Sequence, residues 1–346
     1  MARKQATSRD VAKLAGVSRT TVSFVLNHVP GVKITEETRQ RVLVAARDLD
    51  YYPTAAARSL ASGRTQRIGL ILGEAQDRLA ADAFLPVFLQ GVTASVHRRG
   101  YLLMLQLPED VPSREAYLRL IREQQVDGLI LSGPRSDDPL LNELAEEQFP
   151  LILHGRVNGS AFPYVDVDNQ AGAYRAVTHL IKLGHRRIGF ISNAPVSYSG
   201  AEDRYAGYRQ ALAEHGIPLD ESLVRWGAFL PGTGQAAMKE LLSLPERPTA
   251  VFGASDVVAI GAMSAIQSAG LSIPGDVAVV GFDDIFLAAH THPQLTTVRV
   301  PAYRLGWTAA EILIGLIEGD KGMSSVALET ELVVRASCGA NGVPEL

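Results

Sequence analysis

The chain has 346 residues, 47% of them hydrophobic, and a formal net charge of −4. This length and composition indicate a globular protein with room for a small domain and a large one. Its single cysteine, Cys338, excludes an intramolecular disulfide framework, and no apolar run predicts export or a membrane span, so we expect a cytoplasmic protein.

The charge is unevenly distributed along the chain. Residues 1–67 carry 12 Lys and Arg against 5 Asp and Glu, a net charge of +7, whereas the remainder carries −11. A basic head on an acidic body is typical of a protein whose head alone meets the phosphates of nucleic acid. A solvated basic face is the alternative, but the positive charge coincides with the helical pattern at the start of the chain.

Residues 8–27, SRDVAKLAGVSRTTVSFVLN, predict two short helices joined by a tight turn. Their apolar residues recur at three- and four-residue steps, which favours helices over strands; these residues are Val11, Leu14, Ala15, Val17, Val22, Val25 and Leu26. Ser8 is the expected N-cap of the first helix and Gly16 its end, while Ser18 caps the second. A third helix, capped by Thr35, completes a three-helix bundle.

The second helix has a polar face that suits the major groove of DNA. Recognition helices reach base edges with their N-terminal residues, so Arg19, Thr20 and Thr21 are expected to contact bases or phosphates. Phe24 lies on the same face, where it either packs on a thymine methyl or folds back on its own domain. The expected DNA contacts of the head are Ser8, Ser18, Arg19, Thr20, Thr21, Ser23, Phe24, Asn27 and Tyr51.

Residues 53–65, PTAAARSLASGRT, predict a hinge helix that begins after Pro53 and ends at Gly63. A helix this short is marginal in water and folds only when something packs on it. Leu60 is its one large apolar residue, which indicates either packing against a twin helix or insertion at a minor-groove base step. An ordinary linker is the alternative.

The run DVAKLAGVSRTTVSFVLN, followed by GVKITEETRQRVLVAARDLDYYPTAAARSLASGRTQRIGLIL, resembles the lactose/galactose repressor (LacI-type) family of bacterial transcription regulators. The resemblance extends over about residues 7–336. It implies that the second helix reads the major groove and that paired hinge helices insert Leu60 into the minor groove, with Ala57 and Arg58 beside it. This chain departs from the family at Phe24, where arginine is common.

The remaining chain predicts two similar lobes. RIGLIL (67–72) returns as RIGFIS (187–192), and QGVTASVHRRG (90–100) returns as AGYRQALAEHG (206–216). Short apolar runs alternate with helical stretches, as in doubly wound parallel sheets. The expected fold class is α/β: a helix-turn-helix head (1–52) and a hinge helix (53–65) joined to a two-lobed, periplasmic-binding-protein-like effector domain (66–338). We expect the first lobe at about 66–167 plus 295–322, and the second at about 168–294 plus 323–338.

Ligands of such sheets bind outside the carboxyl ends of the strands, and therefore between the lobes. Carboxylates and arginine can hold paired hydroxyls and an aromatic ring can cover a sugar face, so a sugar or polyol fits best, although a purine would use similar contacts. The candidate effector contacts are Phe84, His154, Arg156, Asp168, Arg204, Phe229, Ser255, Asp256 and Asp283.

The family resemblance assigns effector contacts to four of these candidates, which are Arg204, Asp283, Phe229 and Asp168. Other roles are open for three more: Asp256 could cap a helix, His154 could form part of the cleft wall, and Phe84 could belong to the core.

Catalytic motifs are weak. GTGQAA (232–237) matches the dinucleotide pattern G-x-G-x-x-A, but it follows Pro231 rather than the first strand of a lobe. Phosphate loops and metal-ligand spacings are absent from the sequence, so we expect no cofactor, no metal and no enzyme. We expect a dimeric repressor of transcription whose effector alters how the hinge helices meet. A sugar-binding protein with a vestigial head is the rival interpretation, which the basic head argues against.

Overall fold

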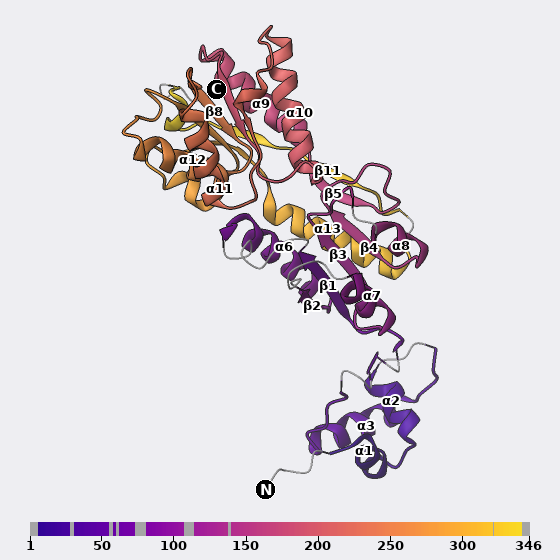
Figure 1. Ribbon diagram of the computed structural model, residues 1–346. Helices are drawn as coiled ribbons and strands as arrows, with labels where there is room; N and C mark the ends of the chain where they lie inside the picture. Colours follow the sequence, from indigo (N-terminus) through magenta and orange to yellow (C-terminus); the bar gives the residue numbers. More distant parts are fainter. Residues whose placement is uncertain are drawn as a thin grey trace. The chain divides into compact units, whose positions relative to one another are not determined.

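The computed structural model describes residues 6–27, 31–54, 58–59, 62–72, 81–106, 114–137, 140–320 and 322–340 (Figure 1). The chain divides into two units, residues 1–67 with 120–127, and residues 68–119 with 128–346. No helix in these described ranges is long and apolar enough to cross a membrane.

Three helices form the head: α1 (Ser8–Ala15), α2 (Arg19–Leu26) and α3 (Glu36–Asp48). They enclose a small core of Val11, Ala12, Ala15, Val22, Val25, Val42, Ala45 and Ala46. The prediction was wrong for Leu14, which is 56% exposed. Ala12, rather than Leu14, completes the inward face of α1 beside Val11 and Ala15.

The ends of the head helices follow from local hydrogen bonds. Gly16 ends α1 in the left-handed conformation (φ 67°), and Ser18 Oγ accepts from Thr21 N at 3.0 Å to cap α2, as predicted. The expected N-cap of α1 was wrong by one residue. Thr7 occupies that position and donates its backbone N–H to Asp10 at 2.9 Å, so Ser8 is the first helical residue.

The hinge is described only in part. Arg58 N donates to Thr54 O at 3.0 Å and Gly63 N donates to Ser59 O at 2.8 Å, which are bonds of helical spacing. Gly63 has φ 69°, the left-handed conformation common at helix ends. Ala57 and Leu60 lie outside the described residues.

The body contains two six-stranded sheets (Figure 1). The first has the order β11 (Val326–Leu328), β5 (Tyr164–Val167), β4 (Leu151–His154), β3 (Gly128–Ser132), β1 (Arg67–Leu72) and β2 (Leu102–Gln106). The second has the order β12 (Glu331–Val333), β10 (Thr296–Arg299), β9 (Ala278–Asp283), β8 (Ala250–Gly253), β6 (Ile188–Ile191) and β7 (Val224–Arg225). The central strands pair in parallel, which confirms two doubly wound lobes.

Helices pack in pairs against these sheets. In the first lobe α6 (Phe84–Arg98) packs on α13 (Ala302–Glu318), and the lobe also contains α7 (Arg114–Arg122) and α8 (Leu140–Glu146). In the second lobe α9 (Asn169–Lys182) packs on α10 (Ser199–Glu214), and α11 (Pro231–Leu242) on α12 (Asp256–Ser268). Short 3₁₀ turns occur at Glu221–Leu223, Phe286–Ala289 and Ala336–Cys338.

The glycine spacing shared by the two lobes has a structural reason. A Cβ atom on Gly91 of α6 would overlap the backbone oxygen of Tyr303 in α13. A Cβ atom on Gly207 of α10 would overlap the backbone oxygen of Gln170 in α9. Each glycine therefore permits a close helix pair at the equivalent place in its lobe.

The expected lobe boundaries were wrong for two strands. β10 lies within the range 295–322 assigned to the first lobe, yet it pairs with β9 of the second sheet. β11 lies within the range 323–338 assigned to the second lobe, yet it pairs with β5 of the first. The chain therefore crosses between lobes later than expected at both points, because the sheet to which a strand belongs is decided by its distant pairing partners rather than by its own sequence.

Candidate ligand cleft and recognition helix

A cleft lies between the two lobes, outside the carboxyl ends of their parallel strands. Its empty space, including the open mouth, is about 770 Å³. Six predicted effector contacts line it: Phe84, His154, Arg204, Phe229, Ser255 and Asp283.

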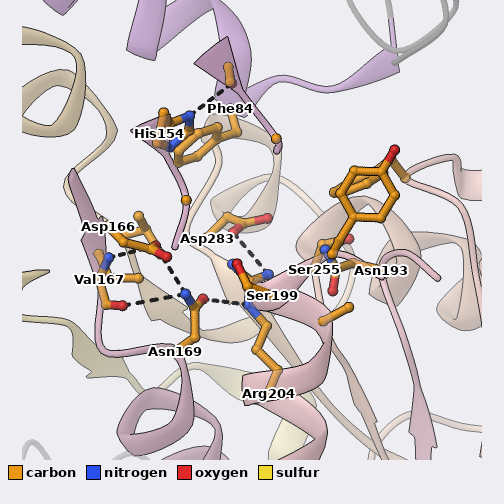
Figure 2. Close-up of a pocket in the computed structure, with 18 of the residues that line it drawn as sticks. Phe84, His154, Asp166, Val167, Asn169, Asn193, Ser199, Arg204, Ser255 and Asp283 are labelled. Carbon is orange, nitrogen blue, oxygen red and sulfur yellow. Dashed lines mark hydrogen bonds and ion pairs between the residues drawn. The ribbon is translucent and has the colours of Figure 1, made fainter. Parts of the chain in front are cut away.

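Arg204 is the central cation of the cleft (Figure 2). Its Nε donates to Asn169 Oδ1 at 2.9 Å, its Nη1 donates to the backbone oxygen of Ala254, and the same Nη1 lies 3.6 Å from Asp283 Oδ1. The guanidinium also lies over the ring of Phe282, 3.8 Å from its centroid. Burial lowers the pKa of Arg204, while Asp283 opposes that effect. These contacts hold a buried charge in one orientation.

Asp166, at the end of β5, connects the first lobe to this cation. Its Oδ1 accepts from Val167 N at 2.7 Å and from Asn169 Nδ2 at 3.0 Å, and Asn169 in turn contacts Arg204 (Figure 2). Burial raises the pKa of Asp166 to about 6. The chain Asp166–Asn169–Arg204 therefore crosses from one lobe to the other.

His154, at the end of β4, forms part of the cleft wall that the first lobe contributes. Its Nδ1 shares a hydrogen bond of 2.8 Å with Ser132 Oγ, and its ring stacks on Phe88 at 4.1 Å and on Phe84 at 5.8 Å between centroids. His154 is therefore packed into the cleft wall, and its contact with an effector stays a prediction.

Three predicted effector contacts are not among the residues that line the cleft. Asp168 caps α9 by accepting from Ala171 N at 2.8 Å. Asp256 is fully buried, where it accepts from Ile285 N at 2.8 Å and from the hydroxyl of Thr297. Arg156 is paired with Asp203 of α10 at 2.9 Å, so it joins the lobes instead of lining the cleft.

Asn169, which the strand-end rule selects beside Asp168, also lines the cleft. Several cleft residues were not selected by that rule: Asp82, Ser132, Asp166, Asn193, Tyr198 and Ser199. Two of them could have been found by it, because Ser132 ends β3 and Asn193 follows the end of β6 by two residues. Asp82, in contrast, has no such signal. Among the described residues, no group of three or more side chains is arranged to hold a metal ion.

The head presents the predicted recognition residues on α2. Ser18, Arg19 and Thr20 are exposed, whereas the other predicted contacts on this helix, Thr21, Ser23, Phe24 and Asn27, are partly exposed. Asn27 Nδ2 donates to Ser23 Oγ at 3.1 Å. Phe24 is not among the described residues that pack on the head core, but Tyr51 is. Ser8 is partly exposed, and Arg58 of the hinge is exposed.

A helix-turn-helix head and a two-lobed ligand domain in one chain define the class of ligand-responsive transcription regulators. Family models agree with both parts: "Bacterial regulatory proteins, lacI family" matches residues 7–54, and "Periplasmic binding protein-like domain" matches residues 177–338. The regulator CelR of Thermobifida fusca is 37% identical over 97% of this chain and 99% of its own length. The chain belongs to the LacI family, as its sequence motifs predicted.

Other relatives have the same organisation. The repressor PurR of Escherichia coli O139:H28 is 35% identical over 96% of each chain. A solved complex of CelR with cellobiose has a TM-score of 0.75 and 36% identity, covering 96% of this chain and 99% of the other. A lac repressor dimer bound to operator and the anti-inducer ONPF has a TM-score of 0.84 and 28% identity, covering 97% and 99%. The protein is therefore a DNA-binding transcription regulator and not an enzyme.

Proposed function

We propose that the protein is a dimeric repressor that binds a palindromic operator, and that a neutral sugar in the cleft changes its affinity for DNA. One observation carries this proposal: Arg204 and Asp283 lie together, with side chains 11% and 10% exposed, in a cleft whose walls come from both lobes. A ligand held by this pair would contact both lobes, and a ligand that prefers one lobe arrangement shifts the population towards it.

The DNA contacts follow from the head and the hinge. In a dimer, α2 of each protomer enters the major groove of one half-site, with Arg19 and Thr20 nearest the bases. The paired hinge helices (53–65) place Leu60 in the minor groove, with Ala57 and Arg58 beside it. The exposure of Arg19, Thr20 and Arg58 supports this assignment. The head would then extend over residues 1–52 and the effector domain over 66–338.

The chemistry of the cleft supports a sugar effector. Carboxylate oxygens of Asp283 and Asp82 can accept from hydroxyls, Arg204 can donate to them, and the ring of Phe229 can cover a sugar face. The relative CelR has been solved in complex with cellobiose, which is a sugar, and this supports a sugar as the effector proposed here. Phe84, His154 and Ser255 complete the proposed contact set.

The proposed coupling starts with contacts between the lobes. The chain Asp166–Asn169–Arg204 and the pair Arg156–Asp203 both connect the lobes. A ligand that rearranges these contacts changes the angle between the lobes and thereby how two hinge helices meet. Because a helix of this length is marginally stable, a few kcal/mol would suffice to fold or melt it.

The test is to recover and sequence genomic fragments of the source organism that the purified full-length protein retains at near-physiological salt. We expect one enriched palindrome, and we expect cellobiose or a related neutral sugar to change affinity for it. Enrichment without a palindrome would contradict the dimeric mode of binding. A palindrome whose binding no sugar alters would leave the DNA assignment intact and contradict the effector class.

A further inference from the structure

Asn193 has an unsatisfied hydrogen-bond acceptor inside the cleft wall. The residue is only 4% exposed, and its Oδ1 has no hydrogen-bond partner among the described residues. Buried acceptors without a partner are uncommon in folded proteins, because burial removes the water that would otherwise bind them. Asn193 also lines the cleft, so a bound ligand is the natural source of a donor.

The backbone on either side of Asn193 is fixed. Its carbonyl oxygen accepts from Phe229 N at 2.6 Å, and the neighbouring Ser192 Oγ donates to Ala194 O at 2.7 Å. These bonds position the residue two places after β6, at the carboxyl end of the second sheet. The side chain is thus held near the cleft by its backbone, while its oxygen remains unused.

The surroundings of Asn193 are partly aromatic. Tyr198 and Phe229 meet edge to face, with centroids 5.8 Å apart, and form a small cluster with Ala194 and Ala201. In Figure 2, Asn193 and Ser255 lie on one side of Arg204 and Asp283, whereas Asp166 and His154 lie on the other. A ligand group on the Asn193 side would therefore meet aromatic carbon of Tyr198 and Phe229, and the guanidinium of Arg135 lies 6.0 Å from the centroid of the Tyr198 ring.

We infer that Asn193 is a specificity residue for the effector, and that its Oδ1 accepts a hydrogen bond from a hydroxyl of a neutral sugar that packs against Tyr198 and Phe229. This inference rests on the proposed function, because it names one contact of the proposed sugar site. A site built to bond a hydroxyl discriminates strongly against analogues that lack it, since the buried acceptor is then left without a partner.

The test compares the full-length protein with two variants. Asn193→Leu removes the acceptor and keeps a similar shape, and Asn158→Ala is a control at an exposed asparagine outside the cleft. Calorimetric titrations would use cellobiose first, then glucose, maltose and lactose. For the sugar that the wild type binds, we expect Asn193→Leu to lower affinity roughly 10- to 100-fold, and Asn158→Ala to retain most of it.

Thermal unfolding without ligand separates this role from a structural one. If the acceptor is unused in the free protein, Asn193→Leu will leave the midpoint unchanged or raise it. A clear fall in the midpoint, or tight sugar binding by Asn193→Leu, would overturn the inference while leaving the effector class standing. If the wild type binds none of these sugars, both the role of Asn193 and the sugar effector class are overturned. A wild-type titration without a binding signal identifies that case.

Discussion

The carboxylate of Asp127 holds Thr65 through two hydrogen bonds: Oδ1 accepts from the backbone N–H at 2.6 Å and from the hydroxyl at 2.9 Å. Its Oδ2 also accepts from Gln66 N at 2.7 Å. Thr65 is the last residue of the proposed hinge, and Asp127 directly precedes β3, the strand that ends at Ser132 in the cleft wall. One side chain therefore fixes the exit of the hinge at the start of a cleft-forming strand.

Asp127→Ala should weaken the link between effector and operator. Removing three bonds to a carboxylate frees the hinge exit, so we expect the effector-dependent change in operator affinity to shrink about tenfold, or roughly 1–2 kcal/mol. Operator titrations with and without effector measure this change. Asp320→Ala, which removes a carboxylate bonded to Gly322 N, is the control. If the effector changes the operator affinity of Asp127→Ala as much as that of the wild type, the bonds from Thr65 to Asp127 are not needed for the coupling.

Arg204→Gln should abolish the response to effector and spare basal DNA binding. The variant loses a buried cation that contacts Asn169 and Asp283, so we expect effector affinity to fall at least about 100-fold, equivalent to roughly 3 kcal/mol. Calorimetry with the effector and an operator titration check the two parts. Leu60→Ala is the reciprocal variant, which should weaken operator binding at unchanged effector affinity. A normal effector response in Arg204→Gln would remove this residue from the site.

Asp166→Asn should change how stability depends on pH. Burial raises the pKa of Asp166 to about 6, so the folded state binds the proton more tightly than the unfolded state, where the pKa is about 3.9. The contribution of Asp166 to the free energy of unfolding therefore falls as pH rises from about 4 to 6, by about 3 kcal/mol, and is constant above that. Relative to wild type, Asp166→Asn should gain this amount by pH 7.

Urea unfolding at several pH values between 4 and 7.5 measures this difference. Asp276→Asn provides a control of opposite sign, because hydrogen bonds from Ser272 lower the pKa of Asp276. Its contribution to stability is lost as pH falls, so this variant should lose stability relative to wild type as pH rises. Parallel pH profiles for wild type and Asp166→Asn would contradict the raised pKa.

Gly207→Ala should destabilise the second lobe. The added methyl group would overlap the backbone oxygen of Gln170, so α9 and α10 must move apart, at a cost of about 1–3 kcal/mol. Gly232→Ala in α11 is the matched control, because its methyl group meets nothing within 4 Å. That control should leave the free energy of unfolding unchanged or slightly raised. Equal urea midpoints for the two variants would mean that the helices tolerate the methyl group.

The sequence by itself determined the elements whose causes are local. Gly16 and Ser18 fix helix ends through bonds within a few residues, and the repeated glycine spacing around Gly91 and Gly207 marks two equivalent lobes. Helix caps and periodic apolar residues act over one or two turns, which is why their pattern can be read directly. The family motifs of residues 8–72 also predicted the function, which is regulation of transcription by binding DNA.

Only the tertiary structure decided which strand-end groups meet in the cleft. Asp283 lines it, whereas Asp256 is buried against Thr297 and Asp168 caps a helix, although all three carboxylates occur near strand ends. The sheet membership of β10 and β11 was decided in the same way. The position of each carboxylate and the sheet of each strand depend on residues far away in the chain. The local sequence does not determine the packing that brings such residues together.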